Sequence, residues 1–180
     1  EGAELLDIGA ESTRPGAGPV TAEEEWTRLA PVLEGVVSLG IPISVDTCKP
    51  EVMRRAIAAG AAMINDVMAL RTQGALEAVA ASDAAICLMH MQGEPRTMQQ
   101  DPHYEDVVQE VADFLRERVE ACEKAGIGRE RIVVDPGFGI GKTLEHNLTL
   151  LRRLDRIAGL GLPLLAGLSR KSTLGKITGR

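Results

Sequence analysis

The stretch 131–143 reads RIVVDPGFGIGKT, and a short β-branched run within it ends in the carboxylate of Asp135. Such a run is typical of a buried strand with an acid at its C-terminal tip. The closing Gly-Lys-Thr looks like the end of a phosphate loop. However, Pro136 stands where the loop motif needs its first glycine. The stretch therefore predicts a strand with an acid at its tip and no nucleotide loop.

Five further apolar runs resemble this one, and most are nearly continuous rather than alternating. Continuous runs are typical of strands covered on both faces, as in parallel sheets. Segments with helical spacing lie between them. The runs occupy residues 4–9, 41–47, 63–67, 85–90, 131–137 and 162–169, and helices are expected over 21–37, 49–60, 103–126 and 144–159.

Local signals mark the ends of the expected helices. Thr21, with Glu24 three residues on, predicts a capping box. Pro50 near a helix start and Gly60 just past its end follow the usual asymmetry of helix termini. Pro31 should kink the first helix or mark a break in it.

The strict alternation of strands and helices predicts an α/β fold, either a doubly wound open sheet or a (β/α)8 barrel. A barrel gathers all strand C-termini at one mouth, whereas an open sheet concentrates ligands at one switch point. Every run here ends in polar groups, which favours the TIM barrel. We expect one domain over 1–180, incomplete at both ends, with about six βα units and the first and last strands missing. The groups at the run ends are Asp7, Asp46, Asn65, Asp66, His90, Asp135 and residues 169–171.

Composition excludes several classes of function. A net charge of −6 gives no sign of the basic surface that binds nucleic acid. With only 2% aromatic residues, the chain also offers little aromatic surface on which bases could stack. No apolar run approaches the length of a membrane span. The three cysteines are far apart, which indicates reduced thiols and a cytoplasmic protein.

The strand-end groups have both structural and functional interpretations. Asp46 could cap the helix that begins near Pro50. Asn65 and Asp66 could form hydrogen bonds to a neighbouring strand of the barrel. Alternatively, they could offer a donor and an acceptor to the edge of a heterocycle. Asp135 needs a partner or a ligand, because a buried, unpaired carboxylate is costly.

Two loops suit anions. Arg14 follows two hydroxyl residues in a long loop that could also be a plain connector. The segment SRKST (169–173) opens a helix, where backbone N–H groups and two cations converge. The histidines, at positions 90, 103 and 146, lie on different elements at no ligand spacing, so we expect no zinc site.

Six stretches carry a resemblance in order and spacing along the chain. They resemble the dihydropteroate synthase family of pterin-binding barrels. The stretches are DIGAESTRPGA (7–17), ISVDTCKPEV (43–52), INDV (64–67), LMHMQGEPRTMQ (88–99), DPGFGIGKTLEHN (135–147) and GLSRKS (167–172).

The resemblance implies a Mg²⁺-dependent transferase of folate biosynthesis, a homodimer and a target of sulfonamides. Such an enzyme joins 6-hydroxymethyl-7,8-dihydropterin pyrophosphate to p-aminobenzoate, giving 7,8-dihydropteroate and pyrophosphate. Early loss of pyrophosphate would leave a cation that nearby carboxylates stabilise. The aromatic amine would then attack, so no side-chain nucleophile is needed.

The resemblance also implies roles for individual residues. Asp46, Asn65 and Asp135 would bond the pterin ring, and Lys171 would lie between the pterin and p-aminobenzoate. Catalysis would rest on Lys171, Asp46 and Asp135. The pterin slot would be lined by Val67, Met89 and Gly167, and the p-aminobenzoate and pyrophosphate loops would contain Thr13, Arg14, Pro15, Ile140, Ser169, Arg170 and Ser172.

Two departures from the family pattern stand out. Ile140 replaces a phenylalanine that packs on the aminobenzoate ring in many members. The family's Mg²⁺-binding Asn, expected before Glu1, and its last-strand Arg-x-His have no counterpart, so 180 residues alone should give no useful turnover. Alternatives are a non-catalytic pterin-binding fragment, a methyltetrahydrofolate–corrinoid methyltransferase, and a phosphate-sugar barrel isomerase.

Overall fold

A computed structural model of the chain describes residues 2–12, 18–93, 97–169 and 175. Within these residues, strands and helices alternate along the chain as expected. The elements are β1 (Leu6–Gly9), α1 (Ala22–Val37), β2 (Ile43–Asp46), α2 (Pro50–Ala58), β3 (Met63–Asp66), α3 (Ala75–Ala80), β4 (Ala85–Met89), α4 (Val107–Lys124), η1 (Arg129–Arg131), β5 (Ile132–Asp135), α5 (Leu144–Arg152) and α6 (Leu154–Ala158).

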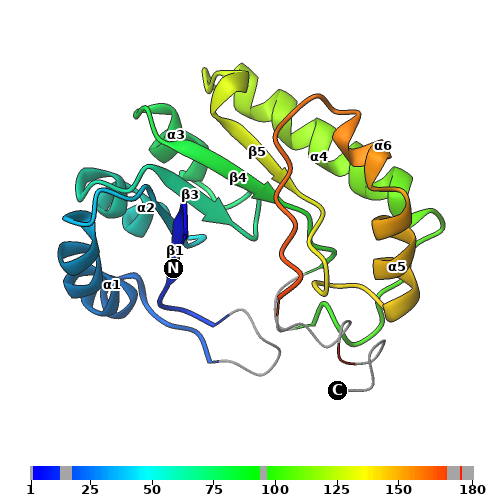
Figure 1. Cartoon of the computed structure of the whole chain (residues 1–180), viewed down its shortest axis with the longest axis horizontal. Coiled ribbons are helices and arrows are strands. Elements are labelled where there is room, and N and C mark those ends of the chain that lie inside the picture. Colours follow the sequence, from blue (N-terminus) through cyan, green and yellow to red (C-terminus); the bar gives the residue numbers. More distant parts are fainter. Residues whose placement is uncertain (1, 13–17, 94–96, 170–174, 176–180) are drawn as a thin grey trace.

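The strands form one parallel sheet in the order β1-β2-β3-β4-β5. The sheet curves, and the helices follow the outside of the arc (Figure 1). Neighbours in sequence are also neighbours in space, without the reversal of order that defines a doubly wound sheet. The sheet is therefore wound as the wall of a barrel.

The sixth apolar run is shorter in the structure than expected. Only Leu164 pairs with β5, through a parallel bridge to Val134. Val134 donates to the carbonyl of Pro163, and Leu165 donates to Val134, so the run lies where the next barrel strand belongs. Pro163 has no N–H to extend the ladder, which agrees with such a short pairing.

Side chains alternate between the two faces of the sheet, because the strand period is two residues. The outward set packs with the helices in one core cluster that includes Val45, Ile64, Ile86, Leu88 and Val134. The opposite set lies on the concave, inner face. Register places there Asp7, Ser44, Asp46, Met63, Asn65, Cys87, Met89 and Asp135.

Most of the predicted helix ends are confirmed. Thr21 and Glu24 form the capping box of α1, and Pro50 is the first residue of α2. Gly60 has a φ of +101°, as a helix terminator needs. Pro31, by contrast, does not break α1, which continues to Val37.

The last predicted helix is divided. Arg153 leaves the helical region with φ −116° and ψ 29°, so residues 144–158 form α5 and α6. Neither Pro nor Gly marks this break in the sequence. His146 lies at the start of α5. Its ring accepts a hydrogen bond from the N–H of Thr143, which completes a second capping box.

Candidate functional site

Four of the polar groups predicted at the strand ends, those of Asp7, Asp46, Asn65 and Asp135, lie on the inner face of the arc. Gly9, Asp46 and Asn65 stand in one row across β1, β2 and β3. Met89 and Asp135 stand opposite each other at the ends of β4 and β5. The pleat and the parallel register together bring five strand ends to one edge, as in a barrel mouth.

Asn65 is the most informative of these groups. It is buried, with 6% of its surface exposed. Its Nδ2 donates to Asp7 Oδ2 at 3.1 Å, across the small side chain of Ser44. Its Oδ1 is buried and accepts no hydrogen bond from any residue that the structure describes. A buried amide oxygen is normally bonded, so a ligand that donates N–H groups fits this position.

Asp46 lies beside Asn65 in an environment that disfavours its charge. Burial first, and then the carboxylates of Asp7 and Asp66, raise the pKa of Asp46 to about 7. The pKa of the buried Cys87 thiol is also raised, by burial and next by Asp135 and Asp7. The inner face thus carries concentrated negative potential, which favours a ligand that donates hydrogen bonds or develops positive charge.

The prediction that Asn65 and Asp66 present a joint donor and acceptor edge is wrong. Consecutive strand residues point to opposite faces, so Asp66 lies on the helix side of the sheet. Its two oxygens accept from the N–H groups of Met68 and Leu70, both at 2.8 Å. Asp66 therefore holds the turn after β3, whereas Asn65 alone faces the site.

Asp135 is buried at the end of β5, with 3% of its surface exposed. Its Oδ1 accepts from the N–H of Gly137 at 2.7 Å. This bond orients the carboxylate along the start of the glycine loop. Asp135 also takes part in an interaction beyond this bond. The acid predicted from the opening stretch is thus fixed by its own loop.

The apolar residues predicted around the ligand also come together. Val67, Met91 and Met98 form a buried cluster that is separate from the main core, and Met68, Met89 and Ile140 pack against it. Val67 and Met89, which were predicted to line a pterin slot, therefore share one apolar wall with Ile140. A polarisable wall of methionines suits a flat ring.

The Gly-Lys-Thr segment differs in its contacts from a phosphate-binding loop. A phosphate loop offers backbone N–H groups and a free lysine to the phosphates. Lys142 is instead buried, and its Nζ donates to the backbone carbonyls of Gly137 and Ile140. The sequence pattern placed His90 at a strand end, but it did not single out Lys142 as part of this site.

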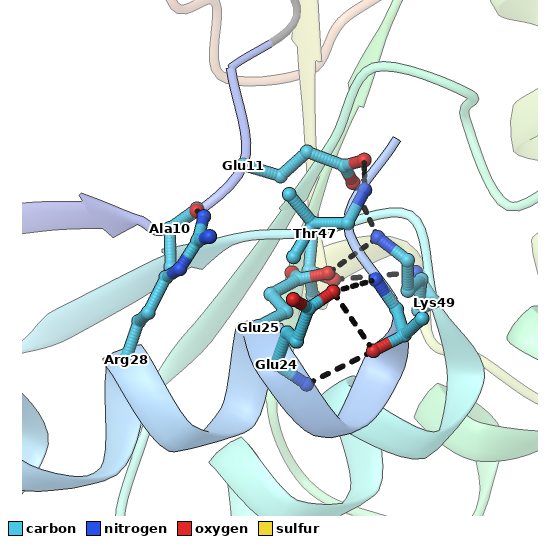
Figure 2. Close-up of polar contacts among 9 residues, drawn as sticks. Ala10, Glu11, Glu24, Glu25, Arg28, Thr47 and Lys49 are labelled. Carbon is cyan, nitrogen blue, oxygen red and sulfur yellow. Dashed lines mark hydrogen bonds and ion pairs between the residues drawn. The ribbon is translucent and has the colours of Figure 1, made fainter. Parts of the chain in front are cut away.

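A second charged network lies at the base of the connection between β1 and α1. Figure 2 shows Lys49 between Glu11 and Glu25. Lys49 Nζ lies 2.6 Å from Glu25, whose side chain is fully buried. The other oxygen of Glu11 accepts from the N–H of Val20 at 3.0 Å. The two ends of the connection are thereby tied to each other and to α1.

Several predicted site residues cannot be placed. Thr13, Arg14, Pro15, Arg170, Lys171 and Ser172 lie outside the described residues. Gly167 is half-buried and Ser169 is exposed, and both follow the Leu164 bridge. The roles expected for these eight residues remain predictions.

Other sites in the described part of the chain are few. It contains no group of three or more His, Cys, Asp or Glu side chains placed to hold a metal ion. It also contains no helix long and apolar enough to cross a membrane. Cavities of about 400 Å³ and 360 Å³ lie along the outer side of α4, near Arg116 and Leu160, away from the inner carboxylates.

Fold and site together define a class: a parallel barrel whose mouth presents carboxylates, an unpaired amide oxygen and an apolar wall. Residues 1–180 match the family described as pterin binding enzyme. The chain belongs to this family of pterin binding enzymes.

Individual relatives narrow the comparison. The chain is 54% identical to the dihydropteroate synthase of Neisseria meningitidis serogroup C over 182 residues, which cover 99% of the chain and 64% of the relative. It is 57% identical to Xanthomonas albilineans dihydropteroate synthase solved with 4-aminobenzoic acid, with a TM-score of 0.94 and coverage of 99% and 64%. The Yersinia pestis enzyme in a sulfonamide complex gives 45% identity, a TM-score of 0.96 and coverage of 99% and 66%. The chain thus spans somewhat less than two thirds of the first relatives it matches.

Proposed function

We propose that this chain is the pterin-binding part of a dihydropteroate synthase. The enzyme would be a transferase of folate biosynthesis that joins 6-hydroxymethyl-7,8-dihydropterin pyrophosphate to p-aminobenzoate. The observation that carries the proposal is the buried Oδ1 of Asn65, beside Asp46, which accepts no hydrogen bond from the part of the chain that the structure describes. The edge of a pterin ring carries N–H groups that can donate hydrogen bonds to such oxygens. The named function of the relatives supports the same assignment.

The proposed reaction makes one bond and breaks another at the pterin methylene carbon. The bond from this carbon to the pyrophosphate oxygen breaks first, and its electron pair leaves with pyrophosphate. The cation that remains is delocalised into the ring, near the carboxylates of Asp46 and Asp135. The amine nitrogen of p-aminobenzoate then attacks the carbon and loses a proton. Preorganised carboxylates lower the barrier, because positive charge develops where they already lie.

The apolar wall has a separate task in this proposal. Met89 and Val67 would contact the flat pterin ring, and Ile140 would contact the aminobenzoate ring. Lys171, Arg170 and Ser172 would bind the anionic groups of the two substrates. The loop with Thr13, Arg14 and Pro15 would cover the same groups.

Mg²⁺, a homodimeric state and a cytoplasmic location are further parts of the proposal. Mg²⁺ would stabilise the charge of the leaving pyrophosphate. The described residues offer no metal-binding cluster, so no step above depends on the metal. Chelation with EDTA should abolish turnover, and added Mg²⁺ should restore it. Sedimentation of the natural full-length protein would test the dimer.

The decisive experiment is pyrophosphate release by the natural full-length protein supplied with dihydropterin pyrophosphate and Mg²⁺. Release that depends on p-aminobenzoate, with dihydropteroate as the product, would establish the synthase. Pterin binding without release would favour a non-catalytic pterin-binding protein or the methyltransferase. Methyl transfer from methyltetrahydrofolate to a corrinoid acceptor would then decide between these two.

A further inference from the structure

The buried ammonium group of Lys142 has three close acceptors. Nζ lies 2.9 Å from the carbonyl oxygen of Ile140, 3.0 Å from that of Gly137 and 3.0 Å from Nδ1 of His90. An ammonium group has three N–H donors and no acceptor. The carbonyl oxygen of His90 lies further from Nζ, at 3.5 Å. The distances to the three nearer acceptors match a protonated lysine that fixes two points of its own loop and the side chain of His90, at the end of β4.

His90 is suited to the role of acceptor. Burial, and next the charge of Lys142, lower the pKa of His90 to about 2. The ring packs edge-on against Phe114, with centroids 5.0 Å apart and an interplanar angle of 86°. A neutral ring that accepts at Nδ1 carries its proton on Nε2. His90 thus gives Lys142 a fixed acceptor throughout the neutral pH range.

The 137–141 loop needs a buried hydrogen-bond donor such as Lys142 because its backbone conformation is unusual. Gly137, Gly139 and Gly141 all have positive φ, at 70°, 74° and 58°. This conformation turns carbonyl groups away from any helix or strand ladder, and a buried carbonyl without a partner is costly. Lys142 donates to the carbonyls of Gly137 and Ile140, the first of which also accepts from the N–H of Ile140 at 3.1 Å. The hydroxyl of Tyr104 donates to the carbonyl of Gly141 at 2.8 Å.

The same loop carries two groups of the proposed site. The N–H of Gly137 holds the carboxylate of Asp135, and the side chain of Ile140 packs on the apolar wall. β5 is held independently by β4 and by the bridge at Leu164. Ile140 has no such ladder, since it lies beyond the strand. Loss of the lysine should therefore displace Ile140 more than Asp135.

We propose that Lys142 is a positioning residue for the aminobenzoate side of the pocket, acting through the 137–141 loop and Ile140. This inference rests on the proposed synthase function for its kinetic consequence. It assigns Lys142 no contact with either substrate. The Gly-Lys-Thr sequence thereby acquires a role in shaping a wall rather than in holding phosphate.

The test compares Lys142→Met with the parent in the natural full-length protein. Hydrogen exchange of residues 137–143 should accelerate about tenfold or more, whereas exchange of β5 should change little. The KM for p-aminobenzoate should rise roughly tenfold, and the KM for dihydropterin pyrophosphate should change less than about threefold. A purely structural role would lower the folded fraction, and so kcat, without separating the two KM values.

Two further variants serve as controls for this test. Lys124→Met makes the same change at a lysine whose side chain is 79% exposed at the end of α4, and it should alter none of these quantities. Tyr104→Phe removes one hydrogen bond from the same loop, and it should shift exchange and the p-aminobenzoate KM in the same direction by a smaller factor. It gives an answer even if Lys142→Met does not fold.

Unchanged exchange at 137–143 in the variant that folds would overturn the inference. Faster exchange with an unaltered p-aminobenzoate KM would overturn it as well. If the parent forms no dihydropteroate, the proposed function fails, and the exchange experiment still shows whether Lys142 fixes the loop. The two failures are therefore distinguishable.

Discussion

Asp46 combines burial with several acidic neighbours, and both conditions favour its neutral form when no ligand is bound. An acid whose pKa is raised in the folded state binds its proton more tightly there than in the unfolded chain. Its favourable contribution is complete below the ordinary pKa of 3.8, and it is lost as the pH rises to about 7. A group placed this way serves a ligand at the expense of the free protein's stability.

Asp46→Asn should therefore raise stability and abolish turnover. The melting temperature of the variant should exceed that of the parent at pH 8, and the difference should vanish near pH 4. Between these limits the parent should lose up to about 1.4 kcal/mol per pH unit relative to the variant. Thermal melts of both proteins at several pH values measure this. Asp83→Asn makes the same change at an exposed position just before β4, and it serves as the control. A constant difference at all pH values would contradict the assignment.

Ile140 offers a second test at the residue scale. It is half-buried and packs beside Met89 in the apolar wall. A phenylalanine there would present more surface to an aromatic ring, and such pairs contribute about 0.5–1.5 kcal/mol. Ile140→Phe should thus lower the KM for p-aminobenzoate and strengthen sulfonamide inhibition roughly threefold or more. Equal sulfonamide inhibition of parent and variant in a side-by-side assay would contradict this prediction.

At the scale of elements, the glycine loop depends on close backbone contact. A Cβ at Gly137 would lie 2.1 Å from the carbonyl oxygen of His90, and φ is +70° there. Gly161 has φ +69° but no atom within 4 Å of the same position. Gly161→Ala should cost about 1 kcal/mol from backbone strain alone. Gly137→Ala adds a backbone clash and should cost more than roughly 3 kcal/mol.

Urea unfolding of the two glycine variants isolates the steric term, since the two residues have nearly the same φ. Similar losses of unfolding free energy would show that the 137–141 loop can move away from His90. A large loss at Gly137 alone would show that the loop is held in place.

The Glu11–Lys49–Glu25 network permits another matched comparison. Lys49→Met leaves Glu25 buried without its cation, which should cost roughly 2 to 3 kcal/mol. Arg55→Met removes an ion pair with Glu23 whose side chains are 44% and 74% exposed, and it should cost less than about 1 kcal/mol. Chemical denaturation compares the two. A smaller loss at Lys49 than at Arg55 would be inconsistent with a buried pair.

Sequence patterns predicted the elements well where chemistry is local. Apolar runs located β1 to β5, and the Thr21–Glu24 pair located the start of α1. The break at Arg153 was not predictable, because neither Pro nor Gly marks it in the sequence. The separation of Asn65 from Asp66 follows from the pleat, but its direction depends on register with β2.

At the scale of the molecule, the barrel order was predictable because polar residues end every run. The role of Lys142 was not predictable, because it requires three left-handed glycines to bring carbonyls to one point. The loops that contain Arg14 and Lys171 lie outside the described residues, so their expected roles rest on resemblance and relatives alone.

The curved sheet also implies a test of the whole molecule. Among the described residues, β1 pairs only with β2, and β5 pairs beyond β4 only at Leu164. Open edges of this kind favour association with other chains. The 180-residue chain made alone should form larger species at micromolar concentration, whereas the natural full-length protein should remain homogeneous. Light scattering of both at equal concentration decides this, and a monodisperse short chain would contradict it.

The hydrogen bond between Glu11 and Val20 has a consequence for how this protein can vary. Because Lys49 anchors that tie to α1, the chain between residues 12 and 19 leaves and re-enters the barrel at nearly one place. Lengthening a connection that is already closed at its base costs little, since closure entropy grows only slowly with length. The fold should therefore tolerate a change in the length of this segment while the inner carboxylates keep their positions, whereas the residues proposed to contact substrate, Thr13, Arg14 and Pro15, should not be replaceable without loss of activity.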